Sequence, residues 1–251
     1  MTDQQPIHDQ PIHDRQPAHD RQPVHPPRPP ASPPPSQAHQ PPPAYLEELL
    51  YRIERATADD IHRFQPPPGA DVRRSAVLVL MAETQAGPDV LLTERSATMR
   101  SQPGQVSFPG GSIDPEDADE YAAALREARE EVGIDTDTIA IHGRMPDLYI
   151  PVRRFAVAPV IGTAPHDYAI DAVNPHEVER AARVPLSMLA DPEVRYTVTA
   201  PNGYRGPAFL VADLFVWGFT ANVLDSVLRL GGFGREWDHH RTVPLPDRFH
   251  R

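Results

Sequence analysis

The sequence predicts a mixed α/β domain, and three observations support this fold class. Helix-like and strand-like hydrophobic patterns alternate along residues 44–251, an order typical of helices packed on both sides of a β-sheet. About 200 residues are ample for one packed core. Residues 1–43 differ sharply in composition, because they are rich in Pro and His. We therefore expect one α/β domain behind a disordered tail.

The tail at residues 1–43 contains Gln-Pro-Ile-His-Asp twice and then related Gln-Pro repeats. With so little apolar side chain, it cannot offset its ordering entropy by burial. We expect stiff, polyproline-leaning disorder. Besides a solvated tail with no fixed role, two functions remain open: docking on a Pro-binding partner, and capture of a transition metal. Metal capture would use His8, His13, His19 and His25.

The first half of the domain begins with helical spacing of apolar residues at 45–55. Strand patterns follow at 75–81 and 89–93, and Gly87-Pro88 is expected to form the turn between them. A further helix is predicted from about Ala118 to Val132, where Gly133 is a natural terminator.

The second half of the domain shows further strand patterns at 139–145, 155–161, 195–200 and 208–211. A short helix is predicted at 185–189 and a longer amphipathic helix at 216–230. In the last twenty residues the sequence predicts no helix or strand.

Bulk composition excludes several classes of function. The chain has no cysteine, which excludes disulfides and thiolate chemistry. Its net charge of −11 argues against nucleic-acid binding, which needs a basic surface. No apolar run reaches the ~18–20 residues of a membrane span, and the N-terminus lacks the apolar core of a signal peptide. We expect a cytoplasmic protein that does not bind membranes or nucleic acid.

The predicted helix at 118–132 carries three carboxylates on one face, namely Glu127, Glu130 and Glu131. Leu125, Ala128 and Val132 occupy the opposite, apolar face. Like charges at i,i+4 repel by ~0.2–0.5 kcal/mol a pair, and a hard divalent cation with oxygen ligands would remove this penalty. The helix is therefore interpreted as part of a Mg²⁺ site. The alternative is a solvent-facing charged helix with Glu/Arg pairs.

The segment from Gly111 to Ile134 resembles the Nudix box, whose pattern is Gly, five residues, Glu, seven residues, and Arg-Glu-hydrophobic-x-Glu-Glu-x-Gly-hydrophobic. Residues from Arg126 to Ile134 match throughout. The front half departs, because Asp117 stands where the box has Glu and eight residues separate it from Arg126. The departure leaves the role of Asp117 open.

The preceding block, Leu91 to Gly111, resembles the coenzyme A pyrophosphatase (CoA diphosphatase) branch of the Nudix hydrolases. That branch carries Leu-Leu-Thr-x-Arg-Ser/Ala, three residues, Arg, three residues, Gly, three residues, and Phe-Pro-Gly-Gly. Every specified position is filled here, including Arg95 and Arg100. The resemblance implies a Nudix α/β/α sandwich with a mixed β-sheet over residues 44–251.

The resemblance also implies an activity and a cofactor. The activity is hydrolysis of coenzyme A or its derivatives at the pyrophosphate, giving 3′,5′-ADP and (acyl-)4′-phosphopantetheine with Mg²⁺ or Mn²⁺. Metal ions neutralise the phosphate charge and activate the attacking water. Glu127 and Glu131, one turn apart, would bind the same ion. Glu130 would hold a second ion or a bridging water.

Other residues take supporting roles in this hypothesis. Arg126 would hold a glutamate in its liganding rotamer, or form only a surface i,i+4 pair. Arg95 and Arg100 would contact phosphate oxygens, or form structural salt bridges. Gly110 and Gly111 allow close approach of the backbone to the ion or phosphate, and by family analogy a carbonyl near Gly111 completes the coordination.

The general base is open among three glutamates. Glu177, in Asn-Pro-His-Glu-Val, is the candidate outside the helix, and Glu127 or Glu130 are the alternatives. The neighbouring His176 can titrate near neutrality, although a lone loop histidine is usually just exposed. Two rival functions also remain: hydrolysis of another nucleoside diphosphate derivative such as ADP-ribose or NADH, and a non-catalytic protein that binds a CoA species or a partner.

Overall fold

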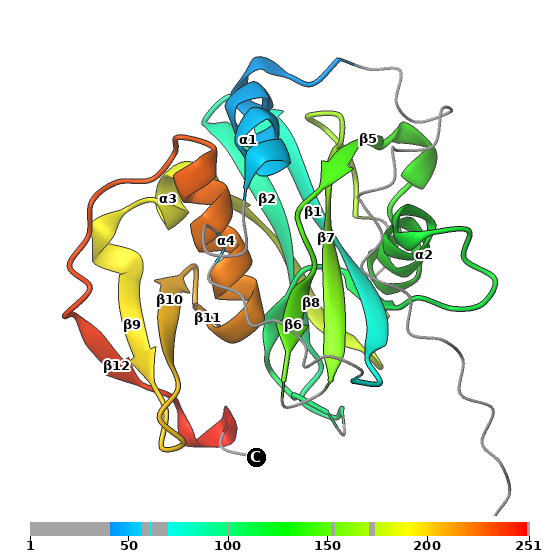
Figure 1. Cartoon of the computed structure of the whole chain (residues 1–251). Coiled ribbons are helices and arrows are strands. Elements are labelled where there is room, and N and C mark those ends of the chain that lie inside the picture. The colour runs from blue at the N-terminus through cyan, green and yellow to red at the C-terminus, as the bar shows by residue number, and fades with distance from the viewer. Residues whose placement is uncertain are drawn as a thin grey trace, which may run out of the picture.

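The structure is a computed structural model that describes residues 41–56, 61, 70–99, 101–151, 154–170 and 174–249. The predicted tail up to residue 40 and the predicted phosphate contact Arg100 lie outside the described residues. The chain forms four layers: helix α2, a first β-sheet, helices α1 and α4, and a second β-sheet (Figure 1). The predicted α/β fold class is confirmed.

The first sheet is mixed and has eight strands. They are β1 (Arg73–Thr84), β2 (Gly87–Arg95), β3 (Val106–Ser107), β4 (Gly110–Ser112), β5 (Ala140–Arg144), β6 (Leu148–Ile150), β7 (Phe155–Thr163) and β8 (Val178–Pro185). The main order is β3-β2-β1-β7-β5, while β4, β6 and β8 pair with β1, β7 and β2. β1 and β7 run parallel, and the other pairs are antiparallel.

The second sheet has four strands in the order β11-β10-β9-β12. They are β9 (Arg195–Thr199), β10 (Arg205–Val211), β11 (Leu214–Val216) and β12 (Thr242–Pro244). The described helices are α1 (Ala44–Arg55), α2 (Glu120–Val132), α3 (Leu186–Leu189) and α4 (Gly218–Leu230), with short 3₁₀ turns η2 (Thr136–Thr138), η3 (Pro192–Val194) and η4 (Asp247–Phe249).

Strand β1 separates two hydrophobic cores because successive side chains point to opposite faces. Leu78 and Leu80 pack with the apolar face of α2. Val79 and Met81 pack with α1, α4 and the inner face of the second sheet. A strand buried on both faces reads as a continuous apolar run, as the sequence Ala-Val-Leu-Val-Leu-Met does at 76–81. No described helix is both long and apolar enough to cross a bilayer.

Helix α2 begins and ends at residues suited to those positions. The side chain of Asp119 accepts hydrogen bonds from Tyr121 N and Ala122 N at 3.0 and 2.9 Å, which caps the helix. Gly133 ends it in the left-handed region at φ 66°. The helix thus starts two residues after the expected Ala118, because the Asp119 cap replaces helical hydrogen bonding there.

Three sequence predictions about the fold need correction. Gly87 and Pro88 belong to β2, and residues 85–86 form the turn. There Thr84 Oγ1 accepts from Ala86 N and donates to Gly87 O. The second sheet was not predicted as separate, and β12 and η4 lie in the segment where no element was expected. Short strands paired across long sequence separations leave little local pattern.

Candidate active site

Gly110 and Gly111, the Gly-Gly loop, form part of the short strand β4 in the first sheet and lie beside helix α2. In β4, Gly110 pairs with Val77 and Gly111 pairs with Ala76. A Cβ atom at Gly110 would lie 2.4 Å from Ala76 O, and one at Gly111 would lie 2.3 Å from Glu127 Oε1. Both distances are far inside van der Waals contact, so any side chain would displace the strand or the glutamate. Glycine at these positions brings the backbone against the carboxylates of α2.

Glu131 is a buried carboxylate at the end of α2, only 4% exposed. Its Oε2 accepts a hydrogen bond from Gly110 N at 3.3 Å. Burial raises the pKa of Glu131 to about 8; the Gly110 hydrogen bond and the charge of Arg95 oppose this shift, and the charges of Glu127 and Glu177 add to it. A carboxylate held in this way is destabilised when ionised, so it is suited to a bound cation.

Glu127 lies one turn before Glu131 and faces Gly111. Burial raises the pKa of Glu127, the ion pair with Arg126 lowers it, and the charges of Glu130 and Glu177 raise it. Glu127 and Glu131 therefore meet beside the loop as two carboxylates that repel each other. Two carboxylates beside one loop supply the oxygen ligands that a hard divalent cation prefers.

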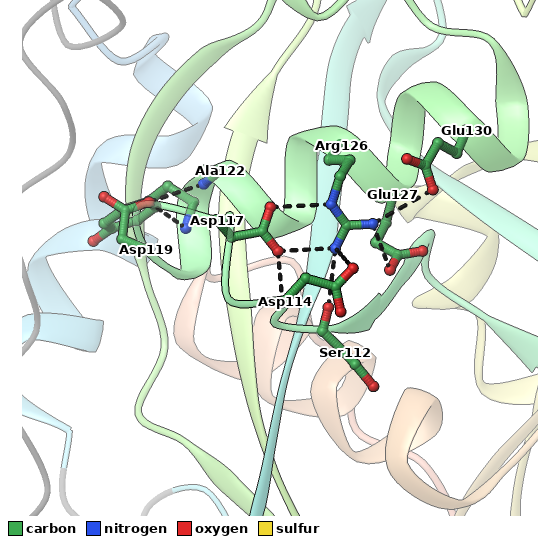
Figure 2. Close-up of polar contacts among 9 residues, drawn as sticks. Ser112, Asp114, Asp117, Asp119, Ala122, Arg126, Glu127 and Glu130 are labelled. Atoms are coloured by element: carbon green, nitrogen blue, oxygen red, sulfur yellow. Dashed lines mark hydrogen bonds and ion pairs between the residues drawn. The ribbon is translucent and has the colours of Figure 1, made fainter.

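Arg126 is the centre of an ion-pair network that Figure 2 shows. Its Nε and Nη2 donate to the two oxygens of Asp117 at 3.0 and 2.9 Å, and its Nη1 donates to Glu127 Oε1 at 3.0 Å. Nη2 also reaches Ser112 O at 3.1 Å. Asp117 is nearly buried, with 6% of its side chain exposed, and the hydrogen bond from Arg126 lowers its pKa.

This network resolves the open role of Asp117. A two-point contact to a planar guanidinium fixes the orientation of Arg126, and Arg126 in turn holds Glu127. The shorter aspartate side chain reaches the arginine from a loop that is one residue longer than the box pattern. Asp117 stands at the Glu position of the box in the sequence, but its contact with Arg126 depends on the fold and has no local sequence signal.

Glu130 differs from its neighbours. Its side chain is 57% exposed, and its Oε2 lies 3.4 Å from Arg126 Nη1. Within the described parts of the chain, no three His, Asp or Glu side chains are grouped closely enough to hold one ion. Glu127 and Glu131 thus interact with each other, whereas the exposed Glu130 contacts Arg126 (Figure 2).

Arg95 and Glu177 complete the site from outside α2. Arg95 ends β2, and its Nε is buried with no hydrogen-bond partner among the residues that the structure describes. Its charge lowers the pKa of Glu131, whereas the charge of Glu177 raises the pKa of both Glu127 and Glu131. Both side chains are thus close enough to the α2 carboxylates to influence their ionisation.

The site combines the buried Glu131, the partly buried Glu127 and an arginine, Arg95, whose Nε has no hydrogen-bond partner among the described residues, all close to the Gly-Gly loop. Such groups can bind a cation and an anionic group together. A family model described as the NUDIX domain matches residues 72–200. The chain therefore belongs to the Nudix family, and it is a Nudix hydrolase.

Two relatives named NudL agree with this assignment. An uncharacterized Nudix hydrolase, NudL, of Photorhabdus laumondii is 36% identical over 179 residues, which cover 68% of this chain and 95% of the relative. The protein of the same name from Enterobacter sp. is 37% identical over 185 residues, covering 70% and 95%. The crystal structure of a Nudix hydrolase from M. smegmatis, RenU, superposes with a TM-score of 0.45 at 18% identity over 64% of this chain and 87% of that chain.

Proposed function

We propose that this Nudix hydrolase cleaves the pyrophosphate bond of coenzyme A or its derivatives, giving 3′,5′-ADP and (acyl-)4′-phosphopantetheine, with residues 44–251 as the catalytic domain. The observation that carries the proposal is the position of Arg95. Its motif, Leu91 to Gly111, resembles the coenzyme A pyrophosphatase branch. Its Nε has no hydrogen-bond partner among the described residues, and its charge lowers the pKa of the buried Glu131. An anionic substrate would supply the partner that this nitrogen lacks among the residues that the structure describes.

Glu127 and Glu131 would hold Mg²⁺ or Mn²⁺, and Glu130 would hold a second ion or a bridging water. A divalent ion bound there supplies charge neutralisation and acidification of a water. Gly110 and Gly111 allow the substrate to approach the backbone. Arg126, oriented by Asp117, keeps Glu127 in its liganding rotamer.

Arg95 binds a phosphate oxygen, and Arg100 follows it in the same motif as a second phosphate contact. Glu177 acts as the general base that accepts a proton from the attacking water, with Glu127 and Glu130 as the alternatives. The position of Glu177 outside the helix suits this role, because its carboxylate is not one of the two proposed metal ligands, Glu127 and Glu131.

The test is a substrate panel with product identification by mass spectrometry. Coenzyme A, its oxidised and acylated forms, ADP-ribose and NADH are incubated with the full chain and Mg²⁺ or Mn²⁺. We expect 3′,5′-ADP and the 4′-phosphopantetheine product. Cleavage of ADP-ribose or NADH alone would replace the proposed substrate, and tight binding of a CoA species without cleavage would indicate a non-catalytic protein.

Two variants sharpen the test. Glu131→Gln preserves shape and abolishes turnover, and retained activity at saturating Mg²⁺ would contradict its role as a ligand. Removal of residues 1–43 leaves turnover near normal if the tail is only an appendage. The Pro-rich tail could instead dock a Pro-binding partner. In a pull-down, such a partner should bind the tail alone but not the chain that lacks residues 1–43.

A further inference from the structure

The turn at Asn174–Val178 carries Glu177 toward helix α2, and Asn174 closes this turn twice. Its main-chain oxygen accepts hydrogen bonds from Glu177 N at 3.0 Å and Val178 N at 2.8 Å. Its side-chain Oδ1 accepts from His176 N at 3.1 Å. The hydrogen bond to Oδ1 forms an Asx turn, in which a side chain imitates a backbone turn.

The same turn is anchored at both of its ends to parts of the site. Asn174 N donates to Glu131 O at 3.0 Å, and Ser96 N donates to Glu177 O at 2.8 Å. The carbonyl of Glu131 lies in the last turn of α2, where helical carbonyls lack partners within the helix. The turn therefore bridges the metal-binding helix and the end of β2.

A β-bulge lies directly after the turn. Val178 pairs with Arg95 and Arg180 pairs with Glu94, so the register shifts and Glu179 is the extra residue. Bulges beside active sites redirect a side chain relative to the regular alternation of a strand. The bulge thus sets the direction in which the chain leaves the turn that carries Glu177 and continues into β8.

We propose that Asn174 is a positioning residue that holds the Glu177 carboxylate against the α2 carboxylates through this Asx turn. The inference deepens the proposed function, on which it rests. Asp and Ser supply a side-chain oxygen for the same turn, whereas Ala supplies none. The main-chain hydrogen bonds of residue 174 remain available to every variant, so the substitutions test the side chain alone.

The experiment is a double-mutant cycle in the full chain with Asn174→Ala, Glu177→Gln and the combined variant, at saturating Mg²⁺. We expect Asn174→Ala to lower kcat by ~10–100-fold, as loss of an outer-shell partner does, with KM changed by less than about threefold. Asn174→Ala should add nothing further in the Glu177→Gln background, because the residue acts through Glu177. Independent, multiplying effects would overturn the proposal.

Conservative replacements and a neighbour serve as controls. Asn174→Asp and Asn174→Ser should restore kcat toward wild type, and equal loss in all three variants at position 174 would contradict the Asx turn. His176→Ala keeps the donating main-chain N–H and removes only an exposed imidazole, so its kcat should stay unchanged. A loss equal to that of Asn174→Ala would assign the role to the imidazole instead.

Two readouts separate this inference from the identity of the substrate. If coenzyme A is not cleaved but another nucleoside diphosphate derivative is, the cycle is measured on that substrate. Amide exchange at Ser96 N, which donates to Glu177 O, needs no turnover. Exchange there should be faster in Asn174→Ala and unchanged in His176→Ala, and equal protection in all variants would overturn the proposal.

Discussion

Replacing Glu131 by Gln should stabilise the metal-free protein while abolishing its metal response. Glu131 is 4% exposed, and burial raises its pKa from 4.5 to about 8. The pKa of Glu131 is higher in the folded protein than in the unfolded chain. The contribution of this carboxyl group to folding stability is therefore fully present below pH 4.5, and it is lost as the pH rises through about 8. Glutamine keeps an oxygen to accept from Gly110 N and carries no charge.

The magnitude follows from the pKa shift. At ~1.4 kcal/mol per pKa unit, the ceiling is about 5 kcal/mol at pH values above the folded pKa. Water penetration and the buried amide of glutamine reduce this gain, so we expect about 1–3 kcal/mol at pH 8.5. For a domain of this size, that gain corresponds to a rise in Tm of about 3–10 °C.

The assay is thermal unfolding in chelator between pH 5 and 9. The stabilisation of Glu131→Gln should be small at pH 5 and grow with pH, because only ionised Glu131 is penalised. Glu130→Gln is the matched control: it removes a charge from an exposed position of the same helix and should change stability by less than about 0.5 kcal/mol. Mg²⁺ or Mn²⁺ should then raise the Tm of the wild type but not of Glu131→Gln.

Two results would refute this reasoning. Equal or lower stability of Glu131→Gln at pH 8.5 without metal would mean that the buried carboxylate is not a strained group. A gain in stability that does not depend on pH would show that the effect comes from packing rather than from ionisation.

Three further predictions concern the same site. Affinity for Mn²⁺, measured by calorimetry, should rise between pH 6 and 8 because Glu131 must lose its proton to bind; a flat profile would contradict its role as a ligand. Asp117→Asn should weaken Mn²⁺ binding by ~10–100-fold, because Arg126 loses its two-point partner; unchanged affinity in the same titration would remove Asp117 from the network. Gly111→Ala places Cβ 2.3 Å from Glu127 Oε1 and should lower kcat by ~10-fold or more in the product assay, where normal turnover would show that the loop adapts.

Much of the fold and part of the site follow from local sequence. The i,i+3 and i,i+4 spacing of Glu127, Glu130 and Glu131 places them within one arc of a helix, whatever surrounds it. The cap at Asp119 and the terminator Gly133 act within one turn of their own position. Continuous apolar runs predict β1, β2 and β7, because a strand that is buried on both faces has apolar residues at successive positions.

Only the tertiary structure determines which of these carboxylates is buried and which is exposed. Glu130 and Glu131 are adjacent in sequence, yet a rotation of ~100° per residue turns Glu131 under the Gly-Gly loop and Glu130 toward solvent. Burial, and with it the raised pKa of Glu131, depends on strand β4, whose Gly110 N–H contacts the Glu131 carboxylate. Glu177 reaches the same site only because strand β8 pairs with β2. Contacts between distant segments leave no local pattern in the sequence. The sequence therefore identifies the candidate residues, but the packing of the sheet on the helix determines their burial and ionisation.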